Sequence, residues 1–271
     1  MARSLVIVAA TGIAASIICL SLASVLSPYR GLSFPFSSGT PYQPWWSHRP
    51  WAGQTPFVES GEIVTREFAW NGGGSAEIYI PGVVYYEPGP EWRVSVKGRA
   101  SSVEHLRIDQ GAILFDAPPA YPHASSLEVR IRGPSLEAIG LNGSGKLVLQ
   151  NVAQQEIGID IRGSGSVEGG GTVERMGLRI FGSGSARLGE LTTRDLDVSI
   201  FGSGDADVAP DGDVEVSIFG SGDVRLHRQP KHVSSKVFGS GRVIQSEPEQ
   251  DKSPVAAPPE AVRPRERSIS I

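Results

Sequence analysis

The feature that most constrains the fold is a short repeat. Gly-Ser-Gly occurs six times, at intervals of 18 to 20 residues. A fixed period of about twenty residues is typical of a solenoid, in which each unit buries its apolar face only by stacking on the next. The corner glycines are Gly143, Gly145, Gly163, Gly165, Gly182, Gly184, Gly202, Gly204, Gly220, Gly222, Gly239 and Gly241. We assign them a structural role, because a corner between two strands needs backbone angles that a Cβ would disfavour.

The residues beside each corner alternate between apolar and polar. Two positions before the first glycine stand Leu141, Ile161, Ile180, Ile200, Ile218 and Val237. Alternation with period two is the signature of a strand, because successive side chains in an extended chain point to opposite faces. Each repeat is therefore predicted to be a strand, a Gly-Ser-Gly corner, a second strand and a variable corner. The interior should be a column of stacked aliphatic side chains.

The amino-terminal segment predicts export. Residues 5–26 are uncharged and mostly apolar, and they follow Arg3. Such a segment is long enough to span a bilayer and is also compatible with a secretory signal. Two hypotheses stay open for residues 1–26: a cleaved signal peptide, or a retained helix that anchors the chain in the inner membrane through residues 5–26. In both cases the charge distribution places the rest of the chain in the periplasm or cell envelope.

Composition divides the remainder into four parts. Residues 27–61 form a linker rich in Pro, Gly and Trp, and residues 246–271 read as a disordered tail. Between them lie an irregular β region (62–135) and the Gly-Ser-Gly repeats (136–245), in which no long amphipathic helix is predicted. The expected fold class is all-β: a single-chain β-solenoid with an N-terminal β-rich region, preceded by a hydrophobic leader helix.

Charge and cysteine content exclude several function classes. A formal net charge of -4 without a basic stripe disfavours nucleic-acid binding. The single cysteine, Cys19, lies in the leader, so the folded part has neither disulfides nor thiolate metal sites. His227 and His232 bracket one variable corner, but the sequence places no third ligand beside them. We expect no metal site, no cofactor and no catalytic residues, and hence no enzyme.

Residues 66–245 resemble the bacterial GIN domain, the head domain of putative autotransporter adhesins. The resemblance is carried by residues 76–82 (AEIYIPG), 92–98 (WRVSVKG), 127–131 (LEVRI) and 141–145 (LNGSG), followed by the recurring corners. It implies a β-solenoid that is exported and held at the bacterial envelope. It brings no catalytic motif to transfer to this chain.

Four phenylalanines form the main candidate interaction site. Phe181, Phe201, Phe219 and Phe238 directly precede their corners and are one residue out of phase with the interior column. They should therefore point away from the core and stack as a ladder. Two interpretations stay open: the rings pack on each other or under a neighbouring segment, or they form an exposed apolar stripe that binds another copy, a partner or a sugar.

A second candidate is a pair of carboxylates. Asp205 and Asp223 occupy equivalent positions in adjacent repeats, which places them about 4.8 Å apart in a strand ladder. They could hold a cation weakly or act as acid and base. Alternatively, both project into solvent as part of an acidic patch.

Three functions follow from these patterns. The leading hypothesis is a non-enzymatic exported envelope protein, a rigid solenoid for adhesion or for surface and assembly interactions. Its partner would be an envelope protein, a glycan or a second copy. The alternatives are a polysaccharide-active or glycan-binding β-helix, and an envelope scaffold that polymerises by stacking open coils end to end.

Overall fold

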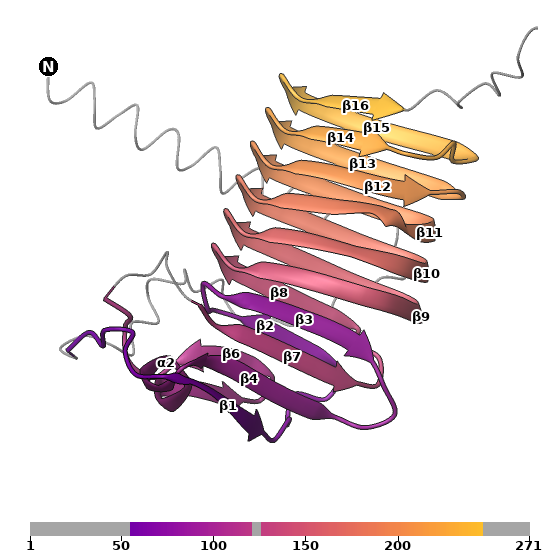
Figure 1. The fold of residues 1–271 in the computed structure, drawn as a ribbon. Coiled ribbons are helices and arrows are strands. Elements are labelled where there is room, and N and C mark those ends of the chain that lie inside the picture. Colours follow the sequence, from indigo (N-terminus) through magenta and orange to yellow (C-terminus); the bar gives the residue numbers. More distant parts are fainter. Residues whose placement is uncertain (1–54, 121–125, 246–271) are drawn as a thin grey trace, which may run out of the picture.

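A computed structural model describes residues 55–120 and 126–245 (Figure 1). The predicted leader helix, most of the linker and the predicted tail lie outside these residues. Within the two described ranges, no helix is long and apolar enough to cross a membrane. Strands dominate the described chain, which confirms the all-β prediction.

The Gly-Ser-Gly repeats stack as parallel coils. Their strands are β9 (Lys146–Gly163), β10 (Ser166–Gly182), β11 (Ser185–Gly202), β12 (Asp205–Pro210), β13 (Asp213–Gly220), β14 (Asp223–Leu226), β15 (His232–Gly239) and β16 (Arg242–Gln245). In the interior, Ile161 pairs with Ile180, Ile180 with Ile200, and Ile200 with Ile218. All four side chains are fully buried. The predicted interior column is therefore confirmed.

The two kinds of corner differ. At each Gly-Ser-Gly corner the first glycine has a positive φ. In the five corners after the first, the serine amide donates to the first glycine of the coil below, as from Ser203 N to Gly182 O at 2.9 Å. At the variable corner, β9, β10 and β11 bend without ending, and the ladder shifts register there, for example between Glu168 and Gly170. The later coils break at this corner, so β12 and β13 are separate strands.

The segment before the repeats extends the same two sheets. It contributes β2 (Ser75–Ile78), β3 (Val83–Pro88), β7 (Glu128–Gly133) and β8 (Ala138–Gly143). On one sheet β2 pairs with β8, and β8 with the second half of β9; on the other, β7 pairs with β3, and β3 with the first half of β9, all in parallel. Residues 79–82 take the place of a Gly-Ser-Gly corner between β2 and β3.

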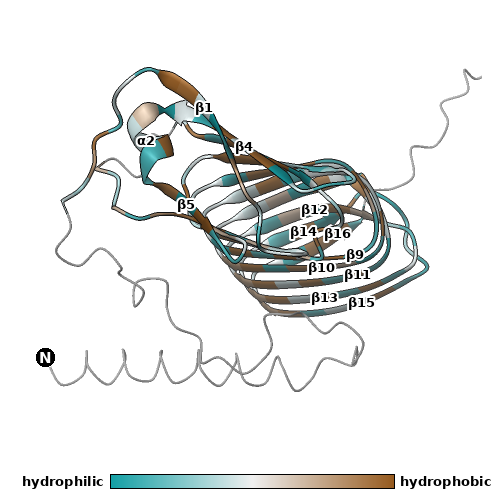
Figure 2. Cartoon of the chain, turned by 90° about the horizontal axis from the view of Figure 1, so that it is seen from below, coloured by the Kyte–Doolittle hydropathy of each residue, from teal (hydrophilic) through white to brown (hydrophobic). Residues whose placement is uncertain are grey.

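The amino-terminal end of the stack is closed by elements of a different kind. They are β1 (Ile63–Phe68), β4 (Arg93–Arg99), the short helix α2 (Ala100–His105), β5 (Leu106–Asp109) and β6 (Ala112–Phe115). β4 runs antiparallel to β7, β1 antiparallel to β4, and β5 antiparallel to β6. Figure 2 views the molecule from the end that carries these elements. At the opposite end, β15 and β16 are the last described strands of the two sheets.

Candidate interaction surface

The phenylalanine ladder lies on the outer face of the sheet formed by β2, β8, β9, β10, β11, β13 and β15; we call this surface the outer face. Phe181, Phe201, Phe219 and Phe238 pair in direct register. Consecutive ring centroids are 5.0, 5.1 and 5.0 Å apart, and the ring planes are within 9° of parallel. The rings therefore pack on each other, with both faces of the two middle rings covered by their neighbours.

Exposure along the ladder is uneven. The first three phenylalanines are half-buried, whereas 62% of Phe238 is exposed. Since stacking covers the ring faces, Phe201 and Phe219 offer only ring edges to solvent. A sugar packs on the face of an aromatic ring, so the two middle rings offer no face to such a ligand, whereas the end ring Phe238 is largely exposed. The rest of the ladder suits apolar side chains of a partner.

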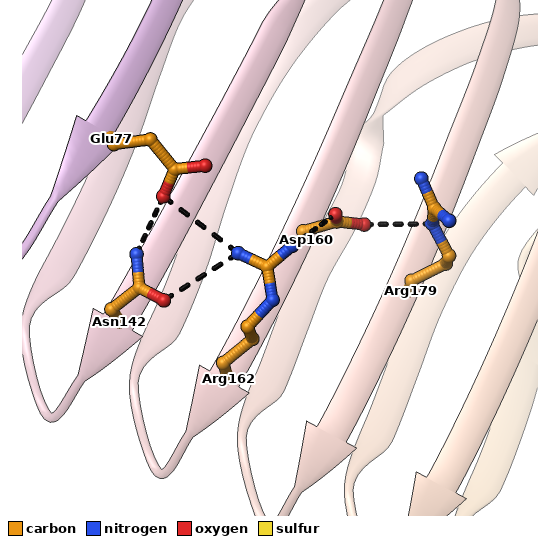
Figure 3. A network of polar contacts seen from close by, with 5 residues as sticks. All are labelled: Glu77, Asn142, Asp160, Arg162 and Arg179. Atoms are coloured by element: carbon orange, nitrogen blue, oxygen red, sulfur yellow. Dashed lines mark hydrogen bonds and ion pairs between the residues drawn. The ribbon is translucent and has the colours of Figure 1, made fainter. Parts of the chain in front are cut away.

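A polar network continues the same column toward the closed end (Figure 3). Asn142 and Arg162 occupy the ladder position in β8 and β9. Asn142 Nδ2 donates to Glu77 Oε2 at 2.6 Å, Arg162 Nη2 donates to Asp160 Oδ2 at 2.8 Å, and Arg179 Nε donates to Asp160 Oδ1 at 2.8 Å. Two carboxylates and two guanidinium groups thus balance in charge across four coils.

Burial explains the electrostatics of this network. Asp160 is only 2% exposed although its side chain points away from the core, and both of its oxygens accept from arginine. A buried carboxylate is tolerated when it is paired and hydrogen-bonded in this way. Burial raises the pKa of Glu77, and the nearby charge of Arg162 and the hydrogen bond from Asn142 oppose that shift. The network links β2, β8, β9 and β10 through side-chain contacts on the outer face.

A second pair of acids lies beside the ladder. Asp197 of β11 and Glu215 of β13 are register partners. Burial, followed by the charge of Glu215, raises the pKa of Asp197 to about 6. Lys236 Nζ lies 3.4 Å from Glu215 Oε1, which keeps that second acid paired. A carboxyl that titrates near neutrality beside another acid is a candidate for acid–base chemistry.

The Asp197–Glu215 pair was not predicted from the sequence, although the sequence contains a signal for it. Both residues stand five positions before a corner glycine, at a position where adjacent coils carry acids. The equivalent positions Gly158 and Gly177 in earlier coils carry no charge. The spacing of the Gly-Ser-Gly repeats alone is enough to align the two acids. It could not have shown that the site is buried, which is what raises the pKa of Asp197.

The predicted pair Asp205 and Asp223 lies in adjacent coils, where Asp205 is exposed and Asp223 is partly covered by Arg242. The Asp223 amide donates to Asp205 Oδ1 at 2.9 Å, and Arg242 Nη2 lies 2.8 Å from Asp223 Oδ2. The hydrogen bond and charge of Arg242 lower the pKa of Asp223. An arginine from the next coil therefore supplies the positive charge that a cation would bring, and Asp223 stays ionised.

Metal ligands do not gather in the described part of the chain. In residues 55–120 and 126–245, no group of three or more His, Cys, Asp and Glu side chains could hold a metal ion. His232 Nδ1 lies 2.8 Å from Asp213, and His227 Nε2 lies 3.8 Å from Asp207. The two histidines thus contact different carboxylates.

Comparison with known proteins gives one family and several structures of similar fold. The family model described as "Putative auto-transporter adhesin, head GIN domain" matches residues 77–230. A solved putative adhesin from Bacteroides fragilis NCTC 9343 is 17% identical with a TM-score of 0.57, and the match covers 70% of this chain and all of that one. None of the curated proteins compared with the chain matches it.

Two further structures come from Parabacteroides distasonis ATCC 8503. One is described as a putative lipid binding protein (16% identity, TM-score 0.43) and the other as a putative adhesin (14% identity, TM-score 0.41). Each match covers 71% of this chain and 100% of the other. At such identities, structural likeness bears on fold alone. The family model, however, spans more than half of the chain, from within β2 to the corner that follows β14. The chain therefore belongs to the GIN head-domain family of putative autotransporter adhesins.

Proposed function

We propose that the chain is a non-enzymatic exported protein of the cell envelope, and that its rigid solenoid presents the outer face for adhesion or assembly. The observation that carries the proposal is the ladder from Phe181 to Phe238, which joins the network of Glu77 and Arg162 on one continuous surface. Related proteins are described as putative adhesins, which accords with this function.

The chemistry of the ladder favours a partner with apolar side chains. Four rings at the coil spacing form a stripe about 15 Å long. Their exposed edges are apolar, and the nearby Asp160 and Glu215 are already paired with arginine or lysine, so a partner can cover the stripe without leaving either carboxylate unmatched. A stripe of this kind is typical of a protein interaction site.

Rigidity contributes to binding at such a surface. The outer-face residues lie on strands that pair on both sides, from β8 to β13, so the surface exists before a partner arrives. A preformed surface loses little conformational entropy when it binds. The solenoid therefore acts as a stiff element that holds its interaction stripe at a fixed orientation.

One observation favours a second function, a glycan-binding or polysaccharide-active protein. Asp197 carries a raised pKa beside Glu215, on the same sheet as the ladder. An acid that holds its proton near pH 6 can serve as a general acid in glycoside cleavage. We rank this function second, because Lys236 already pairs with Glu215.

The test compares two neighbouring substitutions in the full chain. Phe201→Ser opens the ladder, whereas Ile200→Ala weakens the interior one residue away and leaves the outer face intact. Immobilised chains are incubated with bacterial envelope fragments well below each melting temperature, and captured material is quantified. We expect Phe201→Ser to lose most of the capture and Ile200→Ala to retain it.

Equal capture by both variants would contradict the proposed role of the ladder. The same preparations are also assayed for cleavage of an acidic polysaccharide. Cleavage by the unmodified chain that disappears in Asp197→Asn would promote the second function over the first.

A further inference from the structure

We infer that two copies of this chain pair through their carboxy-terminal coils and form a closed, head-to-head dimer. The surface involved is the open end, which we define as residues 227–245 with strands β15 and β16. This inference goes beyond the proposed function, because a chain that stays single could still adhere through its outer face.

The open end exposes side chains that every other coil buries. Val233 is 43% exposed and Val237 39%, whereas their register partners one coil below, Val214 and Ile218, are 4% and 0% exposed. On β16, Val243 is only partly buried, whereas its register partner one coil below, Val224, is fully buried. Among residues 55–120 and 126–245, the interior column thus ends in an uncovered layer rather than in the polar cap that solenoids ordinarily require for solubility.

The backbone at this end is also unsatisfied. β15 pairs only with β13 and β16 only with β14 among the described residues, so one edge of each strand has free amide and carbonyl groups. β15 spans eight residues and contains neither proline nor a bulge. A long edge of this kind is a template for strand pairing.

The two ends of the solenoid differ, and this difference selects a dimer over a filament. The amino-terminal end is closed by the antiparallel strands β1 and β4 and by α2, so it offers no open parallel coil for stacking. End-to-end polymerisation needs two complementary ends. A chain with one open end can instead satisfy it with an identical open end, through a two-fold axis.

The sequence of β15 fits such an axis. When two copies pair antiparallel with Ser235 opposite Ser235, each Val233 faces Val237 of the second copy on the interior side. On the outer side, His232 faces Phe238 and Ser234 faces Lys236. A shift by one residue would mix interior with outer side chains. A shift by two would place Lys236 opposite Lys236, which is destabilising.

Charge does not oppose the pairing. The ionisable groups on β15 and β16 are all basic, but each is matched by an acid one coil below. His232 lies 2.8 Å from Asp213, Lys236 3.4 Å from Glu215, and Arg242 2.8 Å from Asp223. The nineteen residues of the open end approach the roughly 20 to 30 residues that one side of a standard interface contributes.

A single-thiol crosslink tests the pairing. Cys19 is the only cysteine, so the full chain with Cys19→Ser provides a background without thiols. Ser235→Cys is then introduced at the expected axis, where directly opposed Cα atoms about 4.5 to 5.5 Å apart suit a disulfide. Ser203→Cys, at an exposed corner remote from the open end, is the matched control. Both chains are oxidised mildly in detergent at equal concentration and analysed on non-reducing gels.

We expect at least tenfold more two-chain product from Ser235→Cys than from Ser203→Cys. Sedimentation of the thiol-free chain should give the mass of two copies. Val237→Lys should reduce this mass to that of one copy, while the β-sheet circular dichroism is retained. Equal crosslinking of the two thiol chains, or a single sedimenting chain, would overturn the inference and indicate that the open end is covered by residues 246–271 or by another protein. Species larger than two copies that grow with concentration would overturn it in favour of a filament.

Discussion

Replacing one corner glycine by alanine should cost far more than replacing another, although both belong to the same motif. Gly202 and Gly143 are each the first glycine of a corner, and their φ angles are +134° and +97°. A Cβ on Gly202 would lie 2.3 Å from the carbonyl oxygen of Gly182, in the coil below. A Cβ on Gly143 would meet nothing within 4 Å.

The expected magnitudes follow from these two environments. Both substitutions force alanine into a backbone region that costs about 1 to 2 kcal/mol. At Gly202 the added Cβ must also push apart two coils, at about 1 to 3 kcal/mol. The same movement strains the Ser203 N to Gly182 O hydrogen bond, worth about 1 kcal/mol. We therefore expect losses of about 1 to 2 kcal/mol for Gly143→Ala and about 3 to 6 kcal/mol for Gly202→Ala.

Urea denaturation followed by circular dichroism measures both losses in the free energy of unfolding. The unmodified chain and the two variants are compared under one set of conditions, and midpoints are reported together with slopes. Equal losses for the two variants would refute the argument, because they would mean that backbone angle alone, and not the close approach of the coils, requires glycine.

Three further predictions concern single side chains. Because the pKa of Asp197 is raised from 3.8 to about 6 in the folded chain, the stability due to its protonated form is present below pH 4 and is lost as the pH rises through 6. In urea denaturation, the free energy of unfolding of Asp197→Asn should thus equal that of the unmodified chain at pH 4 and exceed it by about 1 to 3 kcal/mol at pH 7. Equal free energies at pH 7 would count against this. Asp160→Asn, which removes a buried charge between two arginines, should cost about 3 to 5 kcal/mol, whereas the exposed control Asp205→Asn should cost under about 0.5 kcal/mol. Ile200→Ala should cost about 2 to 5 kcal/mol and Ile244→Ala on the uncovered coil under about 1 kcal/mol, as read from thermal melts; a similar cost at both positions would be unexpected.

The interior of the repeats could be predicted because it depends only on period. Ile161, Ile180, Ile200 and Ile218 stand at one offset from successive corners, and parallel stacking turns an equal offset into contact. The phenylalanine ladder follows from the same rule. The resemblance to the GIN domain led to the same fold, and the family model bears it out.

The polar network and the first corner depend on contacts that the spacing of the repeats does not encode. Glu77 reaches Asn142 across 65 residues, because β2 pairs with β8 although the chain between them forms β3 to β7. No repeat marks the corner at residues 79–82, so the sequence left that region irregular. The second glycine of each corner also has an unforeseen reason: a Cβ on Gly204 would lie 2.5 Å from the carbonyl oxygen of Gly184 in the coil below and 2.5 Å from Ile180 Cγ2. The close approach of the neighbouring coil and of the interior column, and not backbone angle, requires glycine there.

The stacking of the coils is the central claim, and a distance between two corners tests it most directly. Spin labels are placed at Ser164 and Ser240 in the Cys19→Ser chain, diluted with unlabelled chain so that only distances within one copy contribute. These serines are 76 residues apart in sequence but only four coils apart in the stack, which predicts about 19 Å between their Cα atoms. A narrow distribution near 2 nm by pulsed electron spin resonance is the predicted result. A broad distribution, or one centred beyond about 30 Å, would contradict the stack of four coils at the spacing of paired strands.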